Sequence, residues 1–280
     1  MTHLSIQNVT KEFETRQGKL VALAETSVEI RAGEFVCFVG PSGCGKTTLL
    51  NLIAGLEKPT TGRLLKDGGE IHEPGSDRVV IFQETALFPW LNVIQNVEFG
   101  LVARMEAGKR RHIARTFLNL VHLRRFENSY IHELSGGMKS RVALARALAL
   151  NPSILLMDEP FAALDAQTRG ILHEELQDIC SQTRQTVLFV THNVREAVRL
   201  ADRVLIFTAR PGRIKAEIPI EKSRPRDLVD PDWPVPYIRQ IERELREEIE
   251  KVLREEVDRD WTLKKTDILR PAGIDLGSGI

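Results

Sequence analysis

The residues best suited to chemistry form a glycine-rich run at positions 40–48, Gly40-Pro41-Ser42-Gly43-Cys44-Gly45-Lys46-Thr47-Thr48. The run fits the pattern GxxxxGK[ST] between an apolar stretch that predicts a buried strand and a stretch that predicts a helix. Its glycines let successive backbone N–H groups point at phosphate oxygens, and the helix N-terminus adds a positive dipole end. Lys46 is expected to reach the β- and γ-phosphates of a bound nucleotide, and the Thr47 hydroxyl to bind magnesium. The run therefore predicts a phosphate-binding loop rather than a plain glycine turn.

Two adjacent carboxylates, Asp158 and Glu159, end a second apolar run at residues 154–157. An apolar strand that ends in acids places them at the carboxyl edge of a parallel sheet, where a phosphate-binding loop also opens. We expect Asp158 to bind magnesium, directly or through water, and Glu159 to polarise the attacking water. A plain strand end is the simpler interpretation of this pair alone. Its occurrence 112 residues after Lys46 in the same chain favours the catalytic one.

The elements that must position these residues follow an alternating pattern. Continuous apolar runs at 35–39, 154–157 and 187–190 are separated by helix-like stretches, which predicts a mostly parallel sheet covered on both faces. Residues 4–30 alternate more and predict an antiparallel β region, whereas residues 92–150 read as mostly helical. The pattern is that of an α/β core with a helical insert.

The composition excludes several classes of protein. The 280 residues carry 39 basic and 39 acidic side chains, which disfavours a bulk nucleic-acid binder, so no nucleic acid is expected as a partner. No apolar run approaches the ~18–20 residues that cross a bilayer, and the first residues do not resemble a secretory signal. The three cysteines form no CxxC pair, so neither a disulfide framework nor a zinc site is expected.

A further motif, Leu134-Ser135-Gly136-Gly137-Met138, precedes the carboxylate pair and opens a predicted helix. With the motifs above, the chain resembles the nucleotide-binding subunits of ABC transporters over roughly residues 4–215. The resemblance implies an α/β fold, the ABC type of P-loop NTPase, in which a mixed sheet core carries an antiparallel β subdomain and a helical subdomain. We expect an ATP-binding domain over 1–220, with the helical subdomain at about 84–150, and a charged, largely helical C-terminal extension over 221–280.

The resemblance also implies roles for single residues. Phe13 stands where the family stacks an aromatic on adenine, Gln83 matches the glutamine that touches magnesium and the lytic water, and His192 matches the histidine that holds the γ-phosphate. Ser135, Gly136 and Gly137 form a second anion-binding helix start. In the family this start closes over ATP held by a second subunit, and Asp165 belongs to the loop that crosses to that subunit. The catalytic residues implied are Lys46, Gln83, Glu159 and His192, and the metal ligands are Thr47, Gln83 and Asp158. The cofactors implied are ATP and Mg2+, and the assembly is a head-to-tail dimer around two ATP molecules.

Some positions depart from the usual pattern and resemble one branch of the family. Met138 replaces the glutamine that usually ends the signature motif, and with Ala-Arg-Pro-Gly-Arg-Ile at 209–214 it resembles the nitrate, sulfonate and taurine importers. The resemblance implies an ATPase at the cytoplasmic face of the cell membrane, held by two transmembrane permease subunits and served indirectly by a substrate-binding protein. Its cargo would be a small anion such as nitrate, bicarbonate, a sulfonate or taurine. The alternatives are another importer branch, a soluble ABC ATPase without a membrane partner, and a subunit that binds ATP without turnover.

Two segments keep two interpretations each. The aromatic loop Leu87-Phe88-Pro89-Trp90-Leu91 could dock a helix of a membrane subunit or pack within the helical insert. Residues 235–258 carry one apolar stripe on a highly charged helix. That helix could pack on its own domain, or it could serve pairing or regulation.

Overall fold

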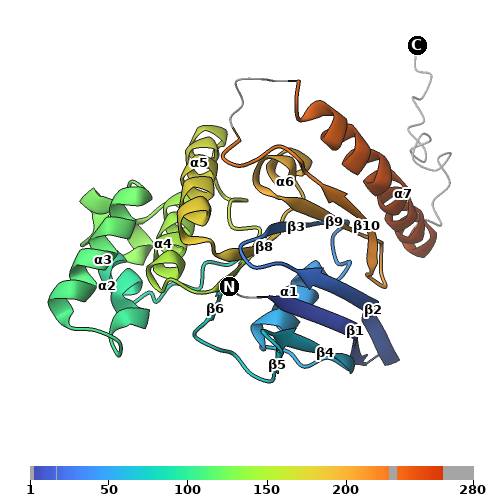
Figure 1. Cartoon of the computed structure of the whole chain (residues 1–280), viewed down its shortest axis with the longest axis horizontal. Helices are drawn as coiled ribbons and strands as arrows, with labels where there is room; N and C mark the ends of the chain where they lie inside the picture. Colours follow the sequence, from blue (N-terminus) through green and yellow to red (C-terminus); the bar gives the residue numbers. More distant parts are fainter. Residues whose placement is uncertain (1–2, 17, 227–231, 261–280) are drawn as a thin grey trace, which may run out of the picture.

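The computed structural model describes residues 3–16, 18–226 and 232–260, with side chains as far as Arg254. Two sheets organise the chain (Figure 1). The first is antiparallel, has the strand order β2-β1-β4-β5 and confirms the antiparallel region expected near the start of the sequence. Its strands are β1 (Leu4–Thr15), β2 (Gly18–Ile30), β4 (Thr61–Lys66) and β5 (Gly69–Glu70).

The second sheet has the strand order β10-β9-β3-β8-β7-β6 and is parallel except for β10, which pairs antiparallel with β9. Its five parallel strands therefore all end at one edge, which we call the carboxyl edge; the opposite one is the amino edge. The strands are β3 (Phe35–Val39), β6 (Arg78–Ile81), β7 (Ile154–Asp158), β8 (Thr186–Val190), β9 (Arg203–Phe207) and β10 (Ile214–Pro219). The three apolar runs predicted as buried strands are thus confirmed.

The parallel strands are buried on both faces, which explains why they are apolar at every position rather than at alternate ones. On β3, Phe35 and Cys37 contact one core cluster, while Val36 and Phe38 contact the other. The cluster around Val36 also contains α1 (Lys46–Ala54) and the antiparallel sheet. The cluster around Phe35 contains helices on the other face, α5 (Ala166–Thr183) and α6 (Val194–Leu200) among them.

The helical insert lies at one end of the molecule, on the Phe35 side of the sheet (Figure 1). Its helices are α2 (Val93–Glu98), α3 (Ala107–Leu120) and α4 (Gly136–Ala149), with short 3-10 helices at Phe99–Leu101, Arg124–Phe126 and Ile131–Glu133. The mostly helical character expected for residues 92–150 is confirmed.

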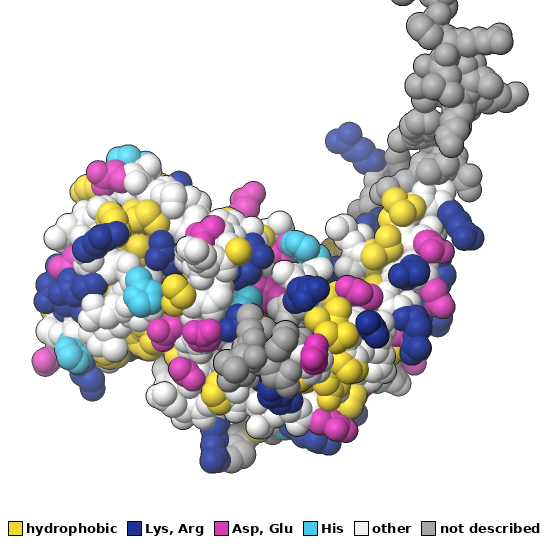
Figure 2. Space-filling model, turned by 90° about the horizontal axis from the view of Figure 1, so that it is seen from above, with side chains coloured by type: hydrophobic (Ala, Val, Ile, Leu, Met, Phe, Trp, Pro, Cys, Tyr) yellow, Lys and Arg dark blue, Asp and Glu magenta, His cyan; other side chains and the backbone are white. Residues whose placement is uncertain are grey.

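The C-terminal helix α7 (Val235–Asp260) lies along β9 and β10 and contacts α6 (Figure 1). Ile238, Ile241 and Leu245 from its apolar stripe are buried in the core on the Phe35 side. Farther along, Ile249 and Leu253 are about half exposed, and Figure 2 shows hydrophobic and charged side chains mixed along this helix. The helix therefore packs on its own chain over its first half. Val257, the last residue of the predicted stripe, lies outside the described side chains.

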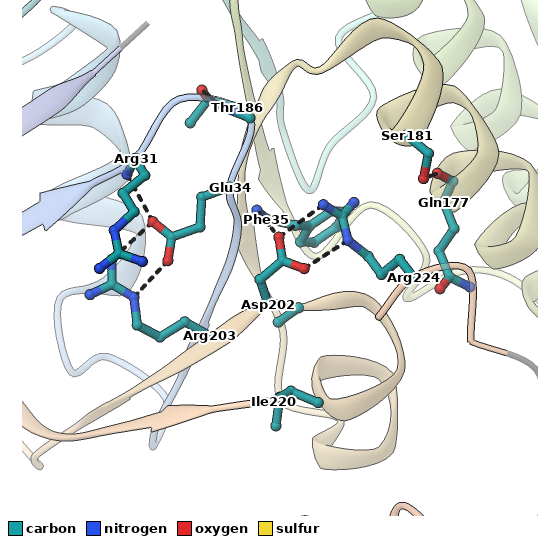
Figure 3. Close-up of polar contacts among 12 residues, drawn as sticks. Arg31, Glu34, Phe35, Gln177, Ser181, Thr186, Asp202, Arg203, Ile220 and Arg224 are labelled. Atoms are coloured by element: carbon teal, nitrogen blue, oxygen red, sulfur yellow. Dashed lines mark hydrogen bonds and ion pairs between the residues drawn. The ribbon is translucent and has the colours of Figure 1, made fainter. Parts of the chain in front are cut away.

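The amino edge of the parallel sheet holds a set of paired charges (Figure 3). Arg224 donates two hydrogen bonds to Asp202, at 2.9 and 2.8 Å, and the same carboxylate accepts the backbone N–H of Phe35. Beside it, Arg203 pairs with Glu34 at 2.9 Å. We call Glu34, Asp202, Arg203 and Arg224 the amino-edge cluster. It joins the segment after β10 to the start of β3.

Candidate nucleotide-binding and hydrolysis site

The phosphate-binding loop adopts the backbone that its glycines allow. Gly45, with a φ of 96°, caps α1, and a Cβ added there would lie 2.6 Å from the carbonyl oxygen of Ala22. Lys46 is buried at the start of α1, and its Nζ donates to the carbonyl oxygens of Gly40 at 2.9 Å and Pro41 at 2.7 Å. The loop therefore presents a helix N-terminus and a buried cation that bonds to backbone carbonyls, an arrangement suited to an anion.

Asp158, at the end of β7, meets the first turn of α1. The Thr47 hydroxyl donates to Oδ2 of Asp158 at 2.8 Å, across 111 residues of sequence. Burial raises the pKa of Asp158, and the neighbouring Glu159 carboxylate acts in the same direction, while the bond from Thr47 opposes them. A hydroxyl and a carboxylate oxygen side by side are the donors that a hard divalent cation such as Mg2+ prefers. The expected juxtaposition of the phosphate-binding loop and the acidic strand end is present.

Glu159 and His192 lie at the ends of the neighbouring strands β7 and β8. Nδ1 of His192 is 3.1 Å from Oε2 of Glu159, which is hydrogen-bond distance. Glu159 has a φ of 48°, a left-handed conformation that is strained for a residue with a side chain. Strain of this kind costs ~1–3 kcal/mol and is concentrated at functional sites.

A cavity beside the same loop is the candidate pocket for the base of a nucleotide, and we call it the nucleotide cavity. This cavity of about 260 Å³ is lined by Phe13 and Leu20 from the antiparallel sheet and by the loop from Gly43 to Thr48. Phe13 is half-buried, and Nζ of Lys11 lies 4.8 Å from the centre of its ring. The ring thus stands where it could stack on a base. Gln83 is exposed just beyond β6, at the carboxyl edge beside β7.

The second predicted anion-binding motif, Ser135 to Gly137, lies at the start of α4 and apart from the phosphate-binding loop. Ser135 caps α4, and its Oγ accepts the N–H of Met138 at 3.3 Å. Asp165 caps α5 in the same way, and a Cβ on Gly137 would lie 3.1 Å from the Leu164 side chain, so the two motifs are neighbours. Because α4 and α1 pack on opposite faces of the sheet, no hydrogen bond between described residues joins Ser135 to the phosphate-binding loop. The signature motif and the phosphate-binding loop therefore lie apart within one chain.

Two residues near the site, Asn193 and Arg210, were given no role there by the sequence. Asn193, next to His192, caps α6 by accepting the N–H groups of Arg195 and Glu196. Arg210 lines the nucleotide cavity from the turn after β9. The sequence offered only the arginine-proline-glycine turn as a signal for Arg210, and nothing in it connected that turn to residues 43–48.

No helix among the described residues is long and apolar enough to span a membrane. Nor does any group of three or more His, Cys, Asp or Glu side chains in that part of the chain form a ready-made metal site. The three cysteines are free and buried.

The fold and the site define a P-loop ATPase, and comparisons with known proteins extend this. A family described as ABC transporter matches residues 23–162. An uncharacterized ABC transporter ATP-binding protein of Methanocaldococcus jannaschii is 49% identical over 89% of this chain and 93% of its own length. The nitrate import ATP-binding protein of Synechocystis sp. is 49% identical over 78% of this chain and 82% of its own length. The taurine import ATP-binding protein of Burkholderia pseudomallei is 49% identical over 80% of this chain and 86% of its own length.

Solved structures of ABC transporter cassettes have a similar fold. A dimeric bacterial ABC transporter cassette has a TM-score of 0.73 and 34% identity, covering 79% of this chain and all of its own. The same cassette in a post-hydrolysis state with ADP and Pi has a TM-score of 0.72. This chain therefore belongs to the ATP-binding proteins of the ABC transporter family, and it is an ATPase of that family. The family resemblance and the fold class expected from the sequence are confirmed.

Proposed function

We propose that this chain is the motor subunit of an importer for a small anion and that it drives uptake with MgATP hydrolysis. The observation that carries the proposal is the meeting of Lys46, Thr47, Asp158, Glu159 and His192 at one sheet edge. Relatives named for nitrate and taurine import support the class of cargo, which we extend to bicarbonate and sulfonates.

In the proposed reaction, Glu159 accepts a proton from water as the water oxygen bonds to the γ-phosphorus and the bond to the β,γ-bridging oxygen breaks. Lys46 and His192 stabilise negative charge on the transferred phosphoryl group, and Gln83 orients the water from the end of β6. Phe13 stacks on the adenine. Glu159 returns to its charged form when its proton passes to the inorganic phosphate or to solvent water, and ADP and phosphate then leave.

A magnesium ion would be held by Thr47 and Asp158, with Gln83 nearby, and the nucleotide phosphates would complete its coordination. The buried position of Asp158 and its bond with the Thr47 hydroxyl fit such an ion. When bound, magnesium supplies charge neutralisation on the β- and γ-phosphates.

The complete ATP site needs a second copy of this chain. Ser135 and Gly136 are exposed at the start of α4, and the exposed Asp165 lies beside them. We propose that these groups close over ATP held by residues 40–48 of a second copy, as a head-to-tail homodimer around two nucleotides. A related cassette of known structure is dimeric, which supports this arrangement.

The aromatic loop at 87–91, with the two residues before it, is the proposed docking site for a permease subunit. Its backbone is held from within: buried Asn96 bonds to the N–H and carbonyl of Phe88, and Arg146 donates to the carbonyls of Thr85 and Ala86. Phe88 packs against Phe99, with ring centres 4.3 Å apart, whereas Trp90 is 69% exposed. The loop thus combines features of both interpretations: Phe88 is partly buried against Phe99, and Trp90 is presented on a fixed loop.

Trp90→Ala tests this docking. We expect transport-coupled ATPase activity and uptake to fall at least about tenfold, the size expected for losing a buried aromatic anchor, while the ATPase activity of the purified chain stays within twofold. Leu253→Ala, which removes an equally apolar exposed side chain from α7, serves as the control and should leave both unchanged. Loss of ATP binding in the Trp90 variant would instead assign the ring to the nucleotide site.

The cargo is tested by uptake. Cells that lack this chain should lose uptake of one labelled anion among nitrate, bicarbonate, taurine and an alkanesulfonate, and the wild-type chain should restore it where Glu159→Gln does not. The tagged chain should also copurify with two membrane-spanning subunits from the membrane fraction, which would place it at the cytoplasmic face. Normal uptake of all four anions would overturn the assigned cargo class, and a chain found without membrane partners would overturn the importer role.

A further inference from the structure

Each parallel strand of the second sheet delivers a segment to the carboxyl edge. The proposed chemistry uses the segments that follow β3, β6, β7 and β8, but it leaves the turn after β9 without a role. This turn, residues 208–213, contains Arg210, which lines the nucleotide cavity together with Phe13 and the loop from Gly43 to Thr48. The fifth strand therefore also ends at the nucleotide cavity.

The turn is held tightly against the phosphate-binding loop. Gly212 accepts the N–H of Ala24 at 2.8 Å and donates to the carbonyl of Ala22 at 3.2 Å. A Cβ added to Gly212 would lie only 1.7 Å from the carbonyl oxygen of Cys44, so only glycine permits this approach. Arg210 is thus carried by a backbone that is fixed to both β2 and the phosphate-binding loop.

The Arg210 side chain extends along the phosphate-binding loop. Its Nε donates to the carbonyl oxygen of Gly43 at 3.2 Å, and its Nη2 lies 2.9 Å from the position of a Cβ on Gly43. No carboxylate among the described residues forms an ion pair with this guanidinium, whereas Arg199, Arg203 and Arg224 are all paired. An exposed, unpaired guanidinium beside a phosphate-binding loop is suited to a phosphate oxygen.

The C-terminal helix fixes the same turn from behind. Glu248 of α7 is 1% exposed, and its Oε2 accepts the N–H of Ala209 at 2.9 Å. Its other oxygen pairs with Lys251 at 2.8 Å and Lys215 at 3.3 Å, so its charge is satisfied without Arg210. The residue next to Arg210 is therefore bonded to the extension that the proposed reaction does not use.

We propose that Arg210 is a further phosphate-binding residue for the nucleotide and that Glu248 in α7 positions it. The inference rests on the proposed nucleotide site at residues 40–48. It makes the C-terminal helix a determinant of nucleotide affinity. A partner protein or substitution that displaces α7 would release the turn at 208–213 and weaken ATP binding at the nucleotide cavity.

Calorimetric titration of the full-length chain with MgATP and MgADP tests the role of Arg210. Arg210→Ala is expected to weaken the affinity for both nucleotides about tenfold, on the scale of one charge-assisted hydrogen bond. The affinity for adenosine, which has no phosphate, should be unchanged when it is measured by competition. Arg213→Ala is the matched control because Arg213 is exposed in the same turn but lies outside the nucleotide cavity, and it should change affinity less than twofold.

Two substitutions separate charge from local structure. Arg210→Lys retains the cation and should stay within about threefold of wild type, whereas Arg210→Gln can still donate to the Gly43 carbonyl but should bind as poorly as Arg210→Ala. Equal affinity of the Lys and Gln variants, or of Arg210→Ala and Arg213→Ala, overturns the proposal. Lys46→Ala tests the proposed nucleotide site independently of Arg210. Unimpaired ATP binding in the Lys46 variant would overturn the nucleotide site, and the Arg210 proposal with it.

The positioning role of Glu248 is tested by comparing single and double variants. Glu248→Ala should weaken the affinity for MgATP about threefold, while Glu248→Gln, which keeps an oxygen for the Ala209 N–H, should bind MgATP normally. The double variant Arg210→Ala/Glu248→Ala should bind no more weakly than Arg210→Ala alone, because the positioning residue then has nothing to position. Glu247→Ala, an exposed neighbour that also pairs with Lys215, is the control. Additive losses in the double variant would overturn the positioning role.

Discussion

The two edges of the parallel sheet use charged residues in opposite ways. At the amino edge, Asp202 accepts two hydrogen bonds from Arg224, and Glu34 pairs with Arg203, so that each charge has a partner from the same chain. At the carboxyl edge, Lys46 bonds to the backbone carbonyls of Gly40 and Pro41 and to Sγ of Cys44, and neither Lys46 nor Arg210 forms an ion pair among the described residues. The contrast fits the proposal that the amino edge serves stability, whereas Lys46 and Arg210 at the carboxyl edge keep their charge available for a ligand.

Arg226 extends the contrast. It is 1% exposed, and its guanidinium donates to the carbonyls of Val198, Ala201 and Ile220 near the C-terminal end of α6. Burial lowers the pKa of Arg226 to about 10, while the Asp202 carboxylate acts in the opposite direction. The group therefore stays charged at neutral pH and holds the segment after β10 against the sheet.

Lys46→Ala should produce the largest change at the carboxyl edge. ATP turnover is expected to fall at least about 100-fold because the cation that faces the β- and γ-phosphates is lost. The free energy of unfolding should change by less than about 1 kcal/mol, because no ion pair is broken and the cost of burying the unpaired Lys46 cation offsets its hydrogen bonds to the Gly40 and Pro41 carbonyls. A phosphate-release assay and urea unfolding measure the two quantities; a large loss of stability would mean that Lys46 serves the fold.

Asp202→Ala at the amino edge should lower stability while leaving ATP turnover nearly unchanged. It removes the partner of Arg224 and the nearest carboxylate to buried Arg226, 3.9 Å away. Because Asp202 is itself 36% exposed, we expect a loss of about 2 kcal/mol in unfolding free energy, below the range for fully buried pairs. ATP turnover per folded molecule should stay within twofold, and a tenfold fall would erase the functional distinction between the edges.

Glu34→Gln should have the smallest effect. Glutamine can still accept the backbone N–H of Arg31, a bond of 2.8 Å in the wild type, but it loses the ionic contact with Arg203. We expect a loss of about 0.5–1 kcal/mol in the same urea experiment, with unchanged turnover. A cost as large as that of Asp202→Ala would mean that the cluster acts as one network rather than as separate pairs.

Much of this arrangement could be predicted from the sequence because its signals are local. Apolar runs marked β3, β7 and β8, and the glycine-lysine pattern marked the phosphate-binding loop. The placement of Asp158, Glu159 and His192 at the ends of their strands also followed from the sequence, whereas the order of the strands in the sheet did not. These signals need only neighbouring residues and the geometry of parallel sheets.

The remainder depends on contacts between distant parts of the chain. Arg210 and Gly43 are 167 residues apart, and Arg224 and Asp202 meet only because β10 folds back along β9. No local pattern distinguishes a paired arginine from an unpaired one. The left-handed backbone of Glu159 and the half-buried state of α7 likewise follow from packing rather than from the residues themselves.

The carboxyl edge, as proposed, is half of a site that a second copy completes, and Glu159→Gln tests this most directly. The substitution removes the base but keeps the nucleotide contacts, so ATP should hold two copies together. Size-exclusion chromatography with light scattering should give twice the chain mass of 31.6 kDa with MgATP and the monomer mass without it. The added substitution Ser135→Ala should return the protein to a monomer. A Glu159→Gln chain that stays monomeric while it binds ATP would contradict the proposed two-copy site, and one that hydrolyses ATP at the wild-type rate would contradict the role of Glu159 as the base.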